Sequence, residues 1–121
     1  MNLRLDMAKT LLEIVEEIKQ HIPHFDCDTA AVNRAKDNGL LIDVREPSEH
    51  ETESVTGAIN IPRGILEMKM LTLEPNRSRP IYLHCASAVR AALSAEQLHR
   101  VGYTHLYVVT GELKNIIQAH A

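Results

Sequence analysis

The stretch Pro80–Ala92, P-I-Y-L-H-C-A-S-A-V-R-A-A, decides the fold because it joins a strand pattern to a helix pattern across a short loop. A proline followed by an apolar, partly β-branched and aromatic run is typical of a buried strand. The alanine- and leucine-rich sequence from Arg90 onward favours a helix that begins at or inside the loop. Cys85 is therefore predicted to lie where the strand ends and the helix starts.

That position makes Cys85 a candidate nucleophile. Backbone N–H groups converge at the start of a helix, and together with the helix dipole they stabilise an anion such as a thiolate. Arg90 follows five residues later, and its guanidinium matches the oxygens of a sulfonate or phosphate in bidentate fashion. We predict that Arg90 binds an anionic substrate; the alternative is that it only caps its own helix.

The length of the loop bears on its chemistry. Only Ala86, Ser87, Ala88 and Val89 separate Cys85 from Arg90. The tyrosine and dual-specificity phosphatases and the related arsenate reductases have His-Cys, five residues and then Arg, a ring that surrounds a tetrahedral phosphate. The shorter ring in this chain resembles the loop of the rhodanese sulfurtransferases, which holds the terminal sulfur of a cysteine persulfide.

Two further segments carry the same resemblance. Residues 40–64, L-L-I-D-V-R-E-P-S-E-H-E-T-E-S-V-T-G-A-I-N-I-P-R-G, are similar to the family segment LIDVREPxEYxxGHIPGAxNIP, and the later G-Y…L-Y-V-V-T-G-E resembles its GY…V..L.GG. The similarity extends over roughly residues 25–117. It implies one rhodanese-like domain over residues 1–121, with an N-terminal helix within residues 1–24.

The resemblance implies two-step sulfur transfer through a Cys85 persulfide. The expected substrates are a small anionic sulfur donor, thiosulfate or a persulfide, and a thiol or cyanide acceptor, with a protein thiol as a further possible acceptor. No metal and no organic cofactor is implied. The expected substrate-binding residues are the loop residues Ala86, Ser87, Ala88, Val89 and Arg90, whose backbone N–H groups would stabilise the outer sulfur.

Four other residues have more ordinary interpretations. Asp43 and Arg45, in the D-V-R-E-P stretch, are possible supporting residues; Asp43 is read as structural and Arg45 is left undecided. His84 is predicted to be structural. Cys27 would act as a resolving thiol only if it reached Cys85 in space.

Ala88 departs from the family, which often has glycine at this point of the loop. Alanine disfavours a positive φ, so we expect the loop N–H groups to point differently. This leaves two alternatives to a sulfurtransferase: a non-catalytic rhodanese module that binds a partner or carries sulfur, and, less favoured, a phosphatase or arsenate reductase of related fold.

The composition excludes several classes of protein. The chain has 121 residues, of which 45% are hydrophobic and 24% charged, as expected of one globular domain. Its net charge of −3 gives no reason to expect nucleic-acid or anionic-membrane binding. The opening residues MNLRLDMAK lack the apolar region of a secretory signal, so the cytoplasm is expected. Two cysteines 58 positions apart and seven scattered histidines indicate neither a disulfide framework nor a metal site.

The remaining patterns alternate between helix and strand. Helices are predicted at 10–21, 28–37 (with Asp28 as N-cap), 65–71, 87–101 and 112–119, with one helical turn at 48–51. Strands are predicted at 40–44, 58–61, 81–84 and 105–109. This alternation predicts a doubly wound α/β domain, a mostly parallel sheet flanked by helices, with its ligand site at the carboxyl ends of the strands.

Overall fold

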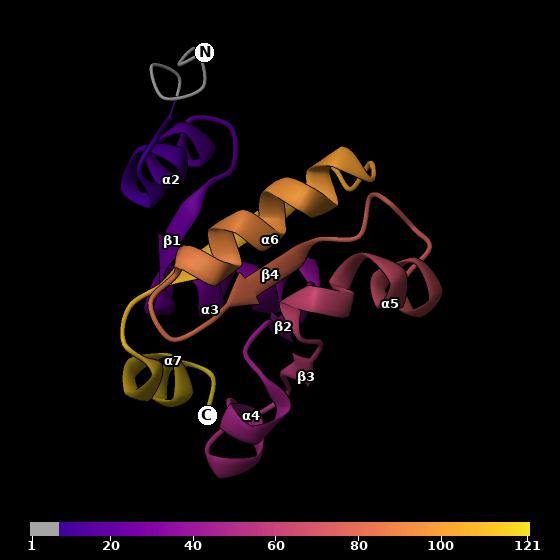
Figure 1. The fold of residues 1–121 in the computed structure, drawn as a ribbon. Helices are drawn as coiled ribbons and strands as arrows, with labels where there is room; N and C mark the ends of the chain where they lie inside the picture. Colours follow the sequence, from indigo (N-terminus) through magenta and orange to yellow (C-terminus); the bar gives the residue numbers. More distant parts are fainter. Residues whose placement is uncertain (1–7) are drawn as a thin grey trace.

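The structure is a computed structural model that describes residues 8–121 (Figure 1). Its helices are α2 (Leu11–Lys19), α3 (Cys27–Asp37), α4 (Pro47–Thr52), α5 (Leu66–Leu73), α6 (Val89–Arg100) and α7 (Leu113–Ala119), with a 3-10 turn at Arg63–Ile65. Its strands are β1 (His24–Asp26), β2 (Leu40–Asp43), β3 (Ile59–Asn60), β4 (Ile81–His84) and β5 (Leu106–Thr110).

The strands form one sheet in the order β1-β5-β4-β2-β3, and every neighbouring pair is parallel. The predicted α/β class with a parallel sheet is confirmed. Strand β4 lies in the middle of the sheet, between β5 and β2. All of its residues are buried, which explains its apolar sequence. Cys85 follows the carboxyl end of β4 and therefore lies near the middle of the side of the sheet where the strands end.

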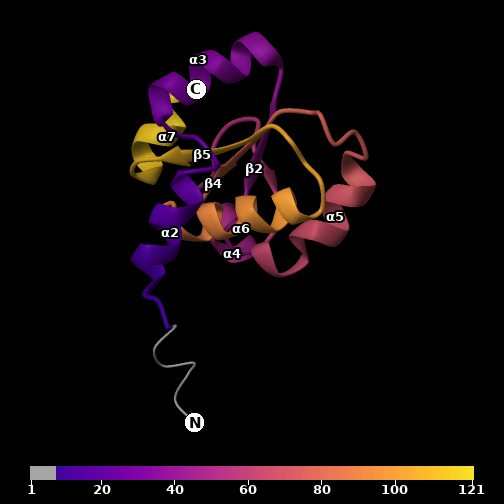
Figure 2. The ribbon, with the colours of Figure 1, turned by 90° about the horizontal axis from the view of Figure 1, so that it is seen from above.

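Helices cover both faces of the sheet, as Figure 2 shows. Helices α2, α5 and α6 pack against one face, where Leu83 and Cys85 belong to the larger core. Helices α3 and α7 pack against the other face, where Tyr82 belongs to the second core. Because side chains alternate along a strand, His84 lies on the same face as Tyr82, opposite to Cys85.

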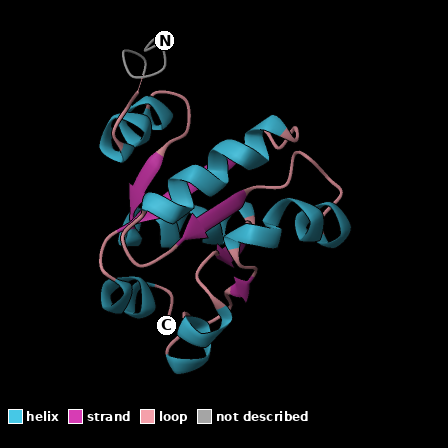
Figure 3. Cartoon of the chain, viewed as in Figure 1, coloured by secondary structure: helices cyan, strands magenta, loops and turns pink. Residues whose placement is uncertain are grey.

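Most of the predicted elements are confirmed, with small shifts at their ends. Thr10 and Glu13 form the predicted capping box at the start of α2. The predicted helical turn at 48–51 is the longer helix α4. Helix α6 begins at Val89 rather than residue 87, so Ser87 and Ala88 belong to the loop between β4 and α6 that Figure 3 shows.

The start of the domain contains one strand that was not predicted and one N-cap that was predicted wrongly. No strand was predicted between Pro23 and α3, yet β1 pairs with β5 there. Its three residues are too few to show a strand period, and β5 stabilises them through the sheet instead. The N-cap of α3 is Asp26, which accepts a 2.8 Å hydrogen bond from the N–H of Thr29, and not Asp28.

Within residues 8–121, none of the helices has both the length and the apolar composition needed to cross a lipid bilayer.

Candidate active site

Cys85 lies immediately after β4 and is only 1% exposed, beneath the loop that leads into α6. The backbone N–H of Ala91, in the first turn of α6, donates to its Sγ at 3.3 Å. A hydrogen bond from a backbone N–H and the positive end of a helix both favour a negative charge on sulfur. Of the loop residues, Ala86 and Ser87 are exposed, so reactants can approach this surface.

Ala88 adopts a left-handed conformation, with φ 68° and ψ −14°. The expectation that alanine would redirect the loop is therefore wrong, since Ala88 takes the positive φ that a glycine would take freely. A left-handed alanine costs about 1–2 kcal/mol, because its Cβ crowds the following carbonyl oxygen. The loop holds its shape against this strain, so other contacts must fix it.

One such contact is an ion pair between Arg90 and Glu49, which we call the outer pair. Nη1 of Arg90 donates to one oxygen of Glu49 at 2.7 Å, and Nη2 donates to the other at 3.0 Å. Hydrogen bonding to Arg90 lowers the pKa of Glu49 to about 2. The guanidinium predicted to bind substrate is thus engaged by a carboxylate of α4. It ties the start of α6 to the segment that follows β2.

A second group of ionisable side chains lies deeper. This buried cluster consists of Asp43, Arg45 and His84 at the ends of β2 and β4, together with the partly exposed His50 of α4. Arg45 reaches Asp43 through Nη2 at 2.8 Å and through Nε at 3.0 Å, and it also donates to the carbonyl of Glu53 at 2.7 Å. Nδ1 of His50 lies 2.8 Å from Oδ2 of Asp43. Burial by itself raises the pKa of Asp43, but the hydrogen bonds from Arg45 and His50 lower it below its ordinary value.

The contacts of Arg45 hold the backbone around it. Arg45 is 3% exposed and donates to Asp43 and to the carbonyl of Glu53, so it joins the end of β2 to the segment after α4. Asp43 is fully buried and accepts from Arg45 and His50, as its structural interpretation requires. Asn60 of β3 donates to the carbonyls of Asp43 and Arg45 and holds the same loop from the other side.

His84 completes the buried cluster from β4, where it pairs in register with Asp43. It is fully buried, and neither of its ring nitrogens has a hydrogen-bond partner among the described residues. Burial lowers its pKa to about 4, so the ring is neutral at pH 7. A neutral imidazole on the face opposite to Cys85 agrees with the predicted structural role.

Cys27 is the first residue of α3 and packs with the second core, on the α3 and α7 side of the sheet. Cys85 belongs to the core on the other side. The sheet therefore separates the two thiols, and the structure does not bring them together as a resolving pair would require.

A hollow of about 500 Å³ lies beside the loop; we call it the loop hollow. Its walls come from the loop residues Ala86–Val89, from one side of α2, from His24 and from Thr110–Glu112 at the end of β5. Arg90 does not line it; that side chain lines a neighbouring hollow together with Glu46 and Arg63. The four loop residues predicted to bind substrate thus share one hollow, and Arg90 faces another.

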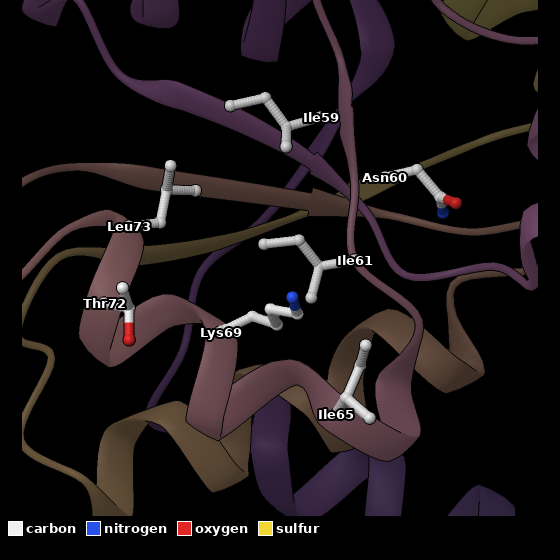
Figure 4. A pocket seen from close by; sticks show the side chains of 7 residues that line it. All are labelled: Ile59, Asn60, Ile61, Ile65, Lys69, Thr72 and Leu73. Atoms are coloured by element: carbon white, nitrogen blue, oxygen red, sulfur yellow. The ribbon is translucent and has the colours of Figure 1, made fainter.

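A third hollow lies between the edge strand β3 and α5 (Figure 4). Ile59, Ile61 and Leu73 line it, whereas Asn60 points away from it toward β2. It contains no cysteine, histidine or carboxylate, and its polar side chains are those of Asn60, Lys69 and Thr72. Across the described part of the chain, no three His, Cys, Asp or Glu side chains are grouped to hold a metal ion.

Sequence reasoning missed two residues of the site, Glu49 and His50. Both belong to the E-P-S-E-H run that follows β2, where α4 forms. The available signal was topological: the carboxyl ends of neighbouring parallel strands meet at one edge, so charges that follow β2 lie near the loop that follows β4.

Comparison with known proteins agrees with this architecture. The model of the rhodanese-like domain matches residues 27–119. An uncharacterised protein of Bacillus subtilis, YqhL, is 39% identical over 74 residues, which are 61% of this chain and 57% of that protein. The thiosulfate sulfurtransferase PspE of Escherichia coli is 35% identical over 75 residues, 62% of this chain and 71% of that one.

A solved structure from Rhodopseudomonas palustris, a protein of unknown function described as a possible tyrosine phosphatase, superposes with a TM-score of 0.76. It is 19% identical, and the match covers 93% of this chain and 92% of that one, so it shows a shared fold. The family match includes β2, β4, the Cys85 loop and both groups of charges. The chain therefore belongs to the rhodanese-like domain family.

Proposed function

We propose that the protein is a sulfurtransferase that moves sulfane sulfur from thiosulfate or a persulfide donor to a thiophilic acceptor through a Cys85 persulfide. The observation that carries this proposal is the position of Cys85: at the end of the central strand, under a four-residue loop, with a backbone N–H directed at its sulfur. The likeness to a relative named as a thiosulfate sulfurtransferase supports it.

In the first step the Cys85 thiolate attacks the outer sulfur of the donor. A bond forms between Sγ and that sulfur, and the donor's own sulfur–sulfur bond breaks, so that sulfite or a thiolate leaves with the electron pair. In the second step cyanide, a small thiol or a protein thiol attacks the outer sulfur and restores the Cys85 thiolate. Both steps need an anionic sulfur to be stabilised near the loop.

The loop is suited to that stabilisation. Backbone N–H groups of Ala86–Arg90 would surround the outer sulfur, and preorganised donors of this kind contribute about 3–4 kcal/mol each where one has been removed from an oxyanion hole. Arg90 holds the loop through Glu49 and adds positive charge near the thiolate: hydrogen bonding to Glu49 mainly, and the charge of Cys85 in part, raise the pKa of Arg90.

Mass spectrometry after exposure to thiosulfate tests the proposal most directly. We expect Cys85 to gain the mass of one sulfur atom and the protein to form thiocyanate from thiosulfate and cyanide. Cys85→Ser should abolish both results, whereas Cys27→Ser, the matched control, should retain most of the activity. Equal loss in the two variants would contradict a mechanism with one cysteine.

The loop length separates sulfur transfer from phosphate chemistry. A four-residue loop encloses one sulfur atom but lacks room for the equatorial oxygens of a phosphoryl group in transfer. We expect negligible hydrolysis of an aryl phosphate. Hydrolysis faster than thiocyanate formation would reject the proposal in favour of a phosphatase, and no reaction with either substrate would favour a non-catalytic module.

A further inference from the structure

The loop hollow has a wall that the family match does not include. The match begins at residue 27, whereas α2 ends at Lys19. Helix α2 packs on α6 through Val15 and Ile18, which belong to the larger core. The same helix presents Leu12 and Val15 to the loop hollow, opposite the loop residues Ala86–Val89. A helix outside the matched residues thus lines the hollow beside the loop that follows Cys85.

The charges around the loop hollow do not favour a small dianion. Lys19 pairs with Glu16 at 3.2 Å, and Glu112 pairs with Lys114 at 3.4 Å. Burial lowers the pKa of His24 below its ordinary value, so its ring is neutral at pH 7. Among the described residues, Lys19 is the one lysine or arginine that lines this hollow, and it is paired with Glu16.

Most of the remaining lining is apolar, with Ser87 and Thr110 as its hydroxyl side chains. Leu12, Val15, Ala86, Ala88 and Val89 present carbon to a space of about 500 Å³. Pockets of roughly 300–1,000 Å³ with apolar walls are the size that holds an organic molecule of moderate size. Thiosulfate consists of one charged sulfonate and one sulfur, so it would fill little of this space and contact none of the carbon wall favourably.

We infer that the loop hollow receives the carbon group of an organic sulfur donor, and that Leu12 of α2 determines this specificity. This inference rests on the proposed sulfur transfer. The donor class is an organic thiosulfonate or persulfide, in which an apolar carbon group carries the transferable sulfur. With a thiosulfonate, the Cys85 thiolate bonds to the outer sulfur, the sulfur–sulfur bond breaks, and a sulfinate leaves with the electron pair. Cyanide then removes the outer sulfur as thiocyanate.

The experiment compares two donors, benzenethiosulfonate and thiosulfate, which produce the same persulfide and the same thiocyanate. The test variant is Leu12→Gln and the matched control is Leu11→Gln. Both leucines lie in the first turn of α2 and are largely exposed, at 74% and 58%, so neither substitution should unfold the protein. Leu12 lines the loop hollow and Leu11 does not. Glutamine is neutral and does not repel either anionic donor.

We expect the wild-type protein to use benzenethiosulfonate with a kcat/KM about tenfold or more above that for thiosulfate, because the ring buries apolar surface. Leu12→Gln should lower kcat/KM for benzenethiosulfonate by about fivefold and change that for thiosulfate by less than about twofold. Leu11→Gln should leave both values unchanged. No preference for the aryl donor, or an equal effect of Leu12→Gln on both donors, would overturn the inference.

A binding measurement tests the inference about Leu12 independently of the proposed sulfur transfer. Benzenesulfinate has the same carbon group but no sulfur to transfer, so its binding can be titrated calorimetrically without turnover. We expect Leu12→Gln, and not Leu11→Gln, to weaken that binding by about fivefold. If neither donor yields thiocyanate but this difference is found, the proposed function fails and the binding site stands. If thiocyanate forms and both variants bind benzenesulfinate like the wild type, the inference about Leu12 fails alone.

Discussion

The buried cluster and the outer pair both join an arginine to a carboxylate at the carboxyl edge of the sheet, but they differ in their exposure to water. The side chains of Arg45 and Asp43 are 4% and 0% exposed, whereas those of Arg90 and Glu49 are each 35% exposed. A charge that loses its partner inside the protein cannot be solvated, whereas a charge at the surface can. The buried cluster should therefore govern folding, and the outer pair should govern the shape of the loop.

The strongest test of this difference breaks the Asp43–Arg45 pair. Arg45→Met leaves the Asp43 carboxylate buried without its main partner, and we expect the free energy of unfolding to fall by about 3–5 kcal/mol. Urea denaturation measures the loss. The double variant Asp43→Asn, Arg45→Met is the control, because it removes both charges and should recover part of the stability. A loss below about 1 kcal/mol in Arg45→Met would show that the cluster is not structural.

The pH dependence of stability separates the two regions further. Burial holds the pKa of His84 at about 4, below its ordinary value of 6.5. Between those two values the unfolded chain binds a proton that the folded protein does not, so stability falls as the pH decreases through this window. We expect His84 to account for a loss of roughly 2–3 kcal/mol by pH 4.

Urea denaturation between pH 7 and pH 4, in the wild type and in His84→Asn, measures this contribution. The variant should show a shallower decline, and the slope that remains above pH 4.5, where Glu49 does not yet contribute, should come from His24 and His120, whose pKa values burial also lowers. An unchanged slope in His84→Asn would mean that His84 is not held neutral in the folded protein.

Glu49 of the outer pair should affect the free energy of unfolding in a lower pH range than His84, and by a smaller amount. Hydrogen bonding to Arg90 keeps the pKa of Glu49 at about 2, below its ordinary value of 4.5. The stability that Glu49 contributes is therefore present above pH 4.5 and is lost as the pH falls toward 2. Because the pair is partly exposed, Glu49→Gln should lower the free energy of unfolding by no more than about 1 kcal/mol at pH 7.

Activity distinguishes the two roles of Arg90. If it positions the loop, Glu49→Gln should lower kcat/KM for thiosulfate by up to about tenfold, and Arg90→Gln should cause a similar loss. If it binds the donor instead, Glu49→Gln would release the guanidinium and raise that kcat/KM. Thiocyanate formation by the two variants therefore decides between positioning and donor binding.

The same contrast explains which parts of the molecule could be predicted from the sequence. Local patterns were sufficient for α2, β4 and Cys85, because the spacing of apolar residues and the strand-to-loop-to-helix order depend on near neighbours in the chain. The partners of the arginines were not predictable in this way. Glu49 and Arg90 are 41 positions apart in sequence, and their contact depends on β2 and β4 lying side by side. Strand β1 was missed for a similar reason, since its pairing with β5 and not its own composition makes it a strand.

The smallest expected effect concerns the strain at Ala88, in the loop that the outer pair restrains. Ala88→Gly should relieve about 1–2 kcal/mol of strain in the left-handed conformation. It should also cost about 0.4–1 kcal/mol, because glycine gives the unfolded chain more freedom. We therefore expect the free energy of unfolding to rise by about 0.5 kcal/mol. Thermal unfolding should register this gain as a rise in Tm of roughly 1–4 °C. If Ala88 carried no strain, the Tm would fall instead, because only the entropy term would remain.

A double variant relates this strain to the outer pair. In wild-type protein the loop adopts the positive φ of Ala88 only while other contacts hold it, and the outer pair is the ion pair that joins the loop's end to α4. Glycine takes that conformation freely, so the loop of Ala88→Gly depends less on Arg90 and Glu49. We therefore expect Glu49→Gln to lower kcat/KM by a smaller factor in the Ala88→Gly background than in the wild type. Equal factors in the two backgrounds would mean that the outer pair and the strained alanine act independently.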